Sequence, residues 1–202
     1  MLGPSIGEDV AVINFNDKLL VAKTDPVTFT ADLIGWYAVN VNANDIATMG
    51  VRPRWFLATI LLPEGCTEKE AERIFDQILA ACDSLEVALV GGHTEITYDF
   101  KRPVVVGCML AEMENQSIIT TSGAKPGDDI VITKGIAIEG TAILARESEP
   151  TLLSSKLSKK LVQRAAKYLF YPGISVLKEA LVARSTVEVH SMHDPTEGGL
   201  AT

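Results

Sequence analysis

Cysteine is scarce in this chain, and long apolar runs are absent from its sequence. The three cysteines, Cys66, Cys82 and Cys108, form no Cys-x-x-Cys pair and have no histidine cluster at zinc spacing beside them. Their spacing argues against a disulfide framework and a structural zinc site. No apolar run approaches the roughly 20 residues of a membrane span, and the first residues do not resemble a secretory signal. We therefore expect free thiols, a cytoplasmic location and no membrane partner.

Basic residues are also few relative to acidic ones. The chain has 18 Lys and Arg against 26 Asp and Glu, so its formal net charge is −8 and its pI is about 4.9. A surface of this sign repels phosphate backbones, and we expect no nucleic-acid partner. Hydrophobic residues make up 47% of the 202 positions, which is enough for a packed core and too many for a disordered chain.

The apolar pattern of the first half predicts alternating strands and helices. The expected strands lie at residues 10–15, 18–24, 54–62, 87–90 and 104–111. The first two are separated by Asn16-Asp17 and form a hairpin pattern, whereas the third suits a strand covered on both faces. One helix is expected from about Leu33, ending before Gly50, and another begins at the capping box of Thr67 and Glu70. This order predicts an α/β (α+β) fold with helices packed on a mixed sheet.

A second unit is expected after a polar stretch near residues 114–122. It is predicted to hold a strand at 130–133, helices around 140–146, 155–170 and 174–183, and a strand at 186–190. Asp194, Pro195 and Glu197 then supply an N-cap, a first-turn proline and an acid at the third helical position, but only five residues follow. We therefore expect domains at residues 1–115 and 116–202, the second being a truncated, partial α/β domain.

One predicted helix is unusually rich in short polar side chains. It carries Asn40, Asn42, Asn44 and Asp45 among apolar residues, although such side chains compete with the helix for backbone hydrogen bonds. They either form a structural network or face a ligand, and the sequence leaves both interpretations open. Just upstream, the Lys23-Thr24-Asp25 segment ends a β-run, where α/β proteins place ligands.

Two glycine-containing segments carry further candidate residues. Gly7 precedes the adjacent acids Glu8 and Asp9, in what is otherwise a plain N-terminal turn. Gly91-Gly92-His93-Thr94-Glu95 follows a predicted strand and suits a loop that approaches phosphate or metal. A structural, hydrogen-bonded role for His93 stays open beside the functional one.

Six segments, taken in order, resemble the aminoimidazole ribonucleotide (AIR) synthase superfamily, and most closely its HypE-like members. The segments are residues 7–12, 23–25, 44–53, 91–95, 122–128 and 194–201. This resemblance implies an N-terminal ATP-binding domain whose strands close a β-barrel with those of a second copy, and therefore a homodimer. It also implies ATP and Mg²⁺ as cofactors. Magnesium prefers hard oxygen ligands, and phosphoryl transfer requires chiefly positioning and charge neutralisation.

The resemblance implies three groups of site residues at the matching positions. The metal ligands would be Asp9, Asp25, Asp45 and Asp194. ATP would be bound by Lys23, Thr24, Asn44, Gly91, Gly92 and Thr94, and the catalytic residues would be His93 and Glu95.

Three departures from the family pattern limit what the resemblance implies. His93 stands where related sequences carry Asp, Glu8-Asp9 replaces an Asp pair, and the sequence ends at Thr202 without the terminal cysteine of HypE. We expect a HypE-like enzyme that transfers the terminal phosphoryl group of ATP to a small molecule or a carbamoylated protein, as in hydrogenase maturation. A thiamine monophosphate kinase-like enzyme and a non-catalytic nucleotide-binding or assembly module are the alternatives.

Overall fold

The structure is a computed structural model that describes residues 3, 7–114, 118–196 and 199. The chain forms two compact units. The first contains Met1–Asp128 and Val176–Asp194, and the second contains Asp129–Ser175 and Pro195–Thr202. The domain boundary at residue 115 stays a prediction. Among the described residues, no helix is both long and apolar enough to cross a membrane.

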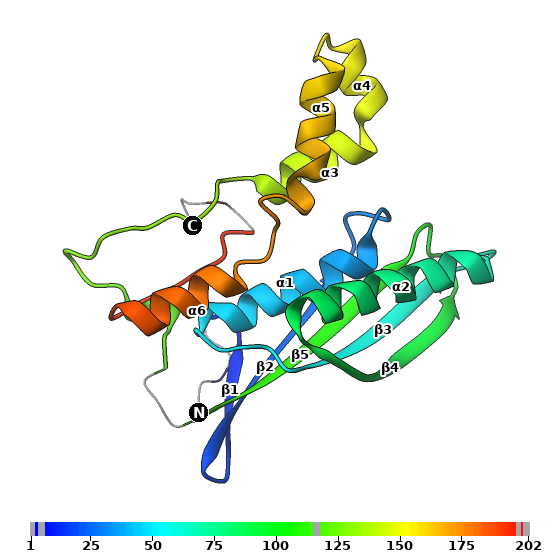
Figure 1. Cartoon of the computed structure of the whole chain (residues 1–202). Coiled ribbons are helices and arrows are strands. Elements are labelled where there is room, and N and C mark those ends of the chain that lie inside the picture. Colours follow the sequence, from blue (N-terminus) through cyan, green and yellow to red (C-terminus); the bar gives the residue numbers. More distant parts are fainter. Residues whose placement is uncertain (1–2, 4–6, 115–117, 197–198, 200–202) are drawn as a thin grey trace. The chain divides into compact units, whose positions relative to one another are not determined.

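The first unit is built on a five-stranded mixed sheet, as the sequence predicts (Figure 1). Its strands are β1 (Ala11–Phe15), β2 (Lys18–Val27), β3 (Trp55–Pro63), β4 (Ala88–Thr97) and β5 (Val104–Glu114). The spatial order is β1-β2-β5-β3-β4, and only the β3–β4 pair is parallel. The hairpin of β1 and β2 is confirmed, with Asn16 in the left-handed conformation at its turn.

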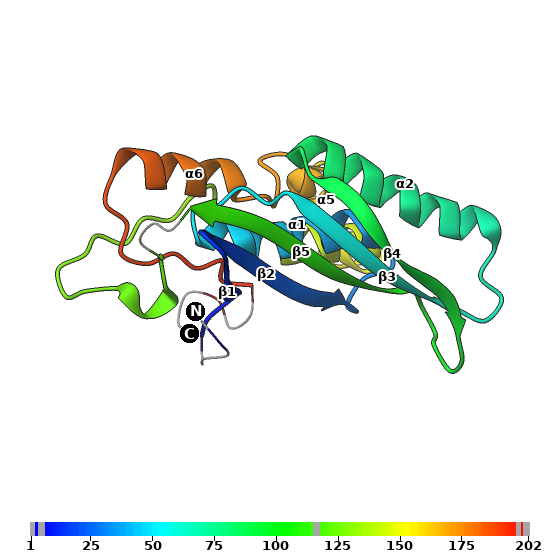
Figure 2. The ribbon, with the colours of Figure 1, turned by 90° about the horizontal axis from the view of Figure 1, so that it is seen from below.

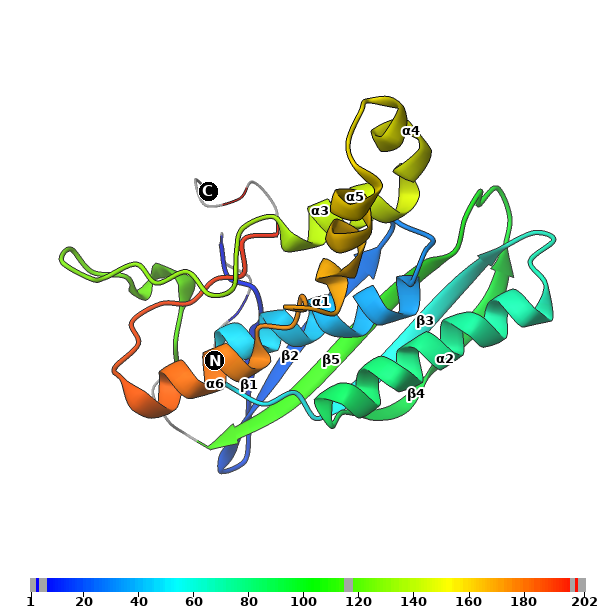
Figure 3. The ribbon, with the colours of Figure 1, turned by 45° about the horizontal axis from the view of Figure 1, so that its top comes forward.

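Helices α1 (Ile34–Thr48) and α2 (Glu68–Leu85) lie side by side over one face of the sheet (Figures 2 and 3). The predicted capping box starts α2, because Thr67 and Glu70 exchange side-chain-to-backbone hydrogen bonds. Helix α1 is buried along almost its whole length, since α2, strands β2 and β5, and α6 (Leu177–Thr186) all pack against it. Gly50 follows α1 with a positive φ of 67°, as expected for a residue just past a helix end.

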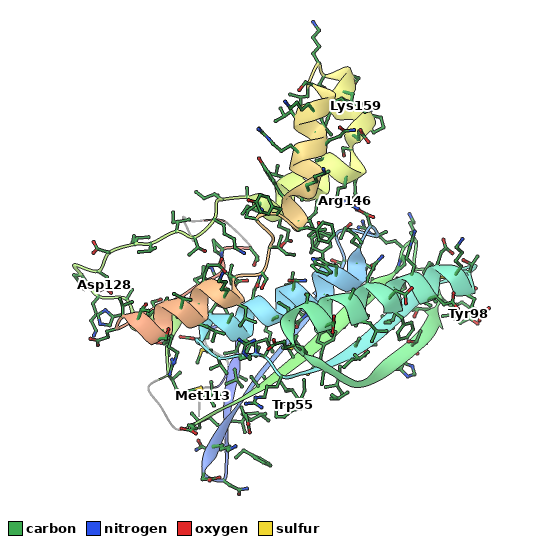
Figure 4. All side chains as sticks on the ribbon, in the orientation of Figure 1. Trp55, Tyr98, Met113, Asp128, Arg146 and Lys159 are labelled. Carbon is green, nitrogen blue, oxygen red and sulfur yellow. The ribbon has the colours of Figure 1, made fainter. Side chains whose placement is uncertain are left out.

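The other face of the sheet is only partly covered in this chain. Along β3 and β5, buried residues alternate with half-exposed ones, so each strand buries one face against the helices. The expectation that residues 54–62 are covered on both faces is therefore wrong for the single chain. Figure 4 shows Trp55, one of the half-exposed residues, on the side of the sheet away from α1 and α2.

The second unit is helical, and the strand expected near its start does not form. Its elements are α3 (Ile138–Glu147), α4 (Glu149–Ser154), α5 (Lys159–Ala166) and the 3₁₀ turn η2 (Lys167–Leu169). Residues 130–133 are irregular, and Ile130 is 91% exposed. The strand prediction fails there because a strand requires a neighbour, and the described part of this unit contains no strand that could pair with it.

Two further predictions for residues 116–202 need correction. The helix expected at 155–170 begins only at Lys159, because Ser158 caps it by accepting a hydrogen bond from Leu161 N–H, and it ends as the 3₁₀ turn η2. The strand expected at 186–190 is wrong, because Thr186 still belongs to α6 and the following residues are irregular. The helix start expected at Asp194 falls mainly on residues 197–198 and 200–202, which lie outside the described residues.

Candidate cation and phosphate site

Carboxyl groups from four distant segments converge in the first unit. Asp9 lies just before β1, Asp25 lies in β2, Asp45 lies in α1, and Asp194 follows α6. Asp45 and Asp194 are only 4% and 5% exposed, although carboxylates are rarely buried without a partner. These four residues are the predicted metal ligands, and the fold places them around one location.

Lys23 holds one half of this cluster together. Its Nζ lies 3.2 Å from Asp45 Oδ2 and 3.5 Å from Asp25 Oδ2. The ammonium group thus partly neutralises the two carboxylates that come from β2 and α1. Burial lowers the pKa of Lys23, but Asp45 and Asp25 raise it by more, so that Lys23 stays charged.

The other half of the cluster contains Asp9, His193 and Asp194. His193 Nδ1 lies 3.3 Å from Asp9 Oδ2, and one ligand atom from each of the three residues lies within 4.8 Å of the others. Asp194 Oδ2 is buried and has no hydrogen-bond partner. Asp45 Oδ2 also lacks a hydrogen bond, although Lys23 lies nearby. Buried acceptors without partners cost free energy, which a bound cation would recover.

The pKa values of the buried acids also show that the cluster has too little positive charge to keep all its carboxylates ionised. Burial is the main cause that raises the pKa of Asp194 to about 9, with a further contribution from the carboxylates of Asp45 and Asp9. Burial also raises the pKa of Asp45 to about 6, although Lys23 opposes this shift. In the absence of a cation, the Asp45–Asp194 pair therefore retains a proton at neutral pH.

The donor set fits a divalent cation. Carboxylate oxygens are the ligands that Mg²⁺ and other hard cations prefer, and two of them are buried here without hydrogen-bond partners. A cation would satisfy these atoms and replace the shared proton. The residues present are thus compatible with the Mg²⁺ that the resemblance implies.

The predicted nucleotide-binding residues near this cluster already have structural partners. Thr24 Oγ1 donates to Gly107 O at 2.7 Å, and Asn44 Oδ1 accepts from Val176 N–H at 2.9 Å. In the same helix, Asn42 Nδ2 donates to Ala38 O and Asp25 O. Asn42 and Asn44 of α1 therefore form structural hydrogen bonds. Of the polar residues expected on this helix, Asp45 is the one whose side chain joins the carboxyl cluster.

The predicted residues at 91–95 lie elsewhere on the sheet. They form part of β4 rather than a loop, because they pair in parallel with β3 beyond a register shift at Phe56/Leu57. β4 is separated from β2 by β5 and β3, which corresponds to about 14 Å at ordinary strand spacing. Within this chain the fold does not bring His93, Glu95, Gly91, Gly92 or Thr94 to the carboxyl cluster.

The second glycine of the pair in β4, Gly92, has a packing explanation. A β-carbon at Gly92 would overlap the carbonyl oxygen of Ala58 in β3, and the φ of Gly92 is +156°. Beside this pair, His93 Nε2 and Glu95 Oε2 lie 3.1 Å apart, and both side chains are exposed. The functional roles of this segment stay predictions.

Sequence reasoning missed His193. The residue stands next to Asp194, but two histidines three residues apart match no zinc motif. Its partner Asp9 is 184 residues away in the sequence. The contact between His193 and Asp9 is visible only in the fold. In the sequence, the one indication of a role for His193 was its position next to Asp194, a predicted metal ligand.

Family profiles match almost the whole chain. The N-terminal domain of AIR synthase related protein matches residues 7–113, and the C-terminal domain of AIR synthase related protein matches residues 125–202.

Curated relatives include a carbamoyl dehydratase and a thiamine-monophosphate kinase. Carbamoyl dehydratase HypE from Cupriavidus necator is 29% identical over 189 residues, covering 88% of this chain and 48% of the relative. Thiamine-monophosphate kinase from Aquifex aeolicus is 27% identical over 155 residues, covering 71% of this chain and 49% of the relative. The chain therefore spans about half the length of the curated relatives it matches.

Solved structures share the fold. AaThiL complexed with AMPPCP and TMP superposes with a TM-score of 0.68 at 21% identity, covering 86% of this chain and 56% of that chain. Hydrogenase maturation protein HypE in complex with ATP superposes with a TM-score of 0.58 at 25% identity, covering 64% of this chain and 41% of that chain.

Proposed function

Because the chain belongs to the AIR synthase related family through both its N-terminal and its C-terminal domain, we propose that it is part of an ATP- and Mg²⁺-dependent enzyme. In this proposal the enzyme transfers the terminal phosphoryl group of ATP to a small acceptor or a carbamoylated protein. The relative HypE was solved with ATP, and AaThiL was solved with the analogue AMPPCP. The observation that carries the proposal is the buried carboxyl groups of Asp45 and Asp194: among the described residues, Asp194 Oδ2 has no hydrogen-bond partner, and Asp45 Oδ2 has only its ion pair with Lys23.

In this proposal, the chain's own residues bind and orient the nucleotide. Asp9, Asp25, Asp45 and Asp194 would hold Mg²⁺, which neutralises phosphate charge when bound. Lys23 is held between Asp25 and Asp45, so its ammonium is positioned to attract phosphate oxygens without searching many rotamers. Thr24 and Asn44 would act mainly by fixing β2 and α1, through their bonds to Gly107 and Val176.

Calorimetric titration of the metal-loaded nucleotide tests this proposal. Asp45→Asn keeps the shape of the side chain and removes its charge. We expect it to weaken Mg-ATP binding well beyond the 10–100-fold typical of an indirect partner, while circular dichroism shows an intact fold. Asp17→Asn, in the exposed hairpin turn, is the matched control and should bind normally. Unchanged Mg-ATP affinity in Asp45→Asn, together with a lower melting temperature, would assign Asp45 to the structural network instead.

The acceptor is proposed from the relatives. By sequence the HypE match covers 88% of this chain against 71% for the kinase, whereas by structure AaThiL covers 86% against 64% for HypE. We take a HypE-like acceptor as the first choice to test. ADP release that requires a carbamoylated cysteine peptide supports this choice. Release that requires thiamine monophosphate supports the kinase alternative. Nucleotide binding without ADP release in either case supports a non-catalytic binding or assembly module.

A homodimer is part of the same proposal. The half-exposed face of the sheet carries apolar residues on its two central strands, including Trp55, Leu57, Val106 and Leu110. A face of this kind is stabilised by packing against another sheet or by closing into a barrel. A second copy of the chain would supply such a surface.

A further inference from the structure

We propose that Asp9, His193 and Asp194 form a cation site with one nitrogen and two oxygen ligands, and that this site prefers Mn²⁺ to Mg²⁺. The inference rests on the proposed cation requirement and names the cation class. The new element is His193, which would bind the cation through its ring nitrogen; the four predicted metal ligands were all carboxylates.

The geometry of the three side chains suits one metal ion. Ligands about 2.1 Å from a metal lie about 3 Å apart when adjacent and about 4.2 Å apart when opposite. His193 Nδ1 and Asp9 Oδ2 are 3.3 Å apart, close to the adjacent-ligand distance. All three ligand atoms lie within 4.8 Å of one another, so a metal requires shifts of only a few tenths of an ångström. Asp194 is 5% exposed, and its Oδ2 has no hydrogen-bond partner in the described part of the chain, so a cation would satisfy this buried atom.

The distribution of charge indicates that, without nucleotide, the cation binds in this half of the cluster, which contains two of the four acids proposed to hold Mg²⁺. Lys23 forms ion pairs with Asp25 and Asp45. Among the residues that the structure describes, no lysine or arginine forms an ion pair with Asp9 or Asp194, and His193 is the basic side chain beside Asp9. A cation from solution would supply positive charge here and displace the proton that the Asp45–Asp194 pair retains.

The ligand chemistry sets the preference. Mg²⁺ demands oxygen ligands and near-ideal octahedral geometry. An imidazole nitrogen favours first-row transition metals, and the affinity of such sites rises from Mn²⁺ towards Cu²⁺. Mn²⁺ also accepts carboxylates well, which makes it the appropriate probe for a site with two carboxylates and one imidazole.

The test measures cation binding to the nucleotide-free chain. Mn²⁺ and Mg²⁺ are titrated by calorimetry into the wild-type protein and into His193→Asn, which replaces the ring nitrogen by an amide. We expect the wild type to bind Mn²⁺ at least about tenfold more tightly than Mg²⁺, and His193→Asn to lose this preference, since even indirect partners change metal affinity 10–100-fold. Mg²⁺ affinity should change little. His190→Asn is the matched control, because His190 lies on the same segment but pairs with Asp128 at 2.8 Å.

A spectroscopic readout makes the ligand assignment direct. Electron spin echo spectra of bound Mn²⁺ should show nitrogen modulation from a coordinated imidazole in the wild type and in His190→Asn, and none in His193→Asn. The proposal is overturned by equal affinity for the two metals, by modulation that persists in His193→Asn, or by no cation binding without nucleotide. Normal Mg-ATP binding alongside such a result would leave the proposed function intact. Mn²⁺ selectivity without any ATP binding would instead refute the proposed function.

Discussion

Lys23 is the residue on which the arrangement of the carboxyl cluster depends most. Its side chain is 18% exposed, whereas that of Asp45 is 6% exposed. A largely buried carboxylate needs a compensating charge, and removing one partner of a buried ion pair leaves the other uncompensated. Lys23 therefore holds α1 against β2 and also keeps Asp45 from being isolated.

Replacing Lys23 tests this dual role. We expect Lys23→Met to lower the free energy of unfolding by about 2–4 kcal/mol, near the lower end of the cost of breaking a buried pair. Asp45→Asn in the same chain should restore part of the loss, because it removes the stranded charge. Lys18→Met is the control, since its pair with Glu112 is exposed and should contribute less than about 1 kcal/mol. Urea denaturation measures all four proteins, and equal losses in the two lysine variants would refute the argument.

Asp194 makes stability depend on pH. Its pKa is raised to about 9 from 3.8, first by burial and then by the carboxylates of Asp45 and Asp9. The folded chain thus binds a proton that the unfolded chain releases above pH 4. This stabilisation is complete below about pH 4 and is lost as the pH rises towards 9.

Thermal melts in EDTA between pH 5 and 9 check this prediction. The melting temperature of the wild type should fall across the range, and that of Asp194→Asn should fall less. At pH 9 the variant should be the more stable protein, because it no longer buries an unpaired charge. Parallel curves for the two proteins would show that Asp194 does not titrate in this window.

At the scale of elements, the close approach of α1 to β5 sets the position of the cluster. Gly107 in β5 lies beneath Asn42 of α1, and Asn42 in turn donates to Asp25 O in β2. A β-carbon at Gly107 would overlap Asn42 Nδ2 and lie 2.7 Å from the Phe56 ring. The helix can therefore bring Asp45 to Lys23 only because position 107 has no side chain.

Gly107→Ala tests this dependence. We expect a loss of about 1–3 kcal/mol in unfolding free energy, which is typical of overpacking a core, together with weaker cation binding because α1 is displaced from β2. Gly91→Ala is the control, since the nearest atom to a β-carbon there is 3.9 Å away. Chemical denaturation and Mn²⁺ titration measure the two effects, and a stable Gly107→Ala protein with normal Mn²⁺ affinity would contradict the argument.

The elements of the first unit could be predicted because their signals are local. The capping box at Thr67 and Glu70 and the hairpin at Asn16 require only neighbouring residues. The extension of β4 through Gly92 could not be predicted, because it depends on pairing with β3. The strand predicted at 130–133 failed for the same reason. Its β-branched residues favour a strand, but the described part of the second unit offers no neighbouring strand to pair with them.

At the scale of the whole molecule, the candidate site depends on contacts between segments far apart in the sequence. The acids at 9, 25, 45 and 194 were predicted from motifs, and the fold places them together. The contact of His193 with Asp9 could not be predicted, nor could the pairing of Lys23 with Asp25 and Asp45 but not with Asp9 and Asp194. Both depend on distances across the fold. Motifs thus indicated the type of chemistry, and only the fold shows how the charges are divided.

The half-exposed sheet face leads to the last prediction. Leu57 and Val106 lie on this face, in the central strands β3 and β5. If a second copy covers the face, Leu57→Glu places a charge in an apolar interface and should convert a dimer into a monomer at micromolar concentration. Leu79→Glu, at a 52% exposed position on α2, should leave the dimer intact. Light scattering coupled to size exclusion measures the mass of each protein, and a wild type that is monomeric at these concentrations would rule out a dimer formed through this face.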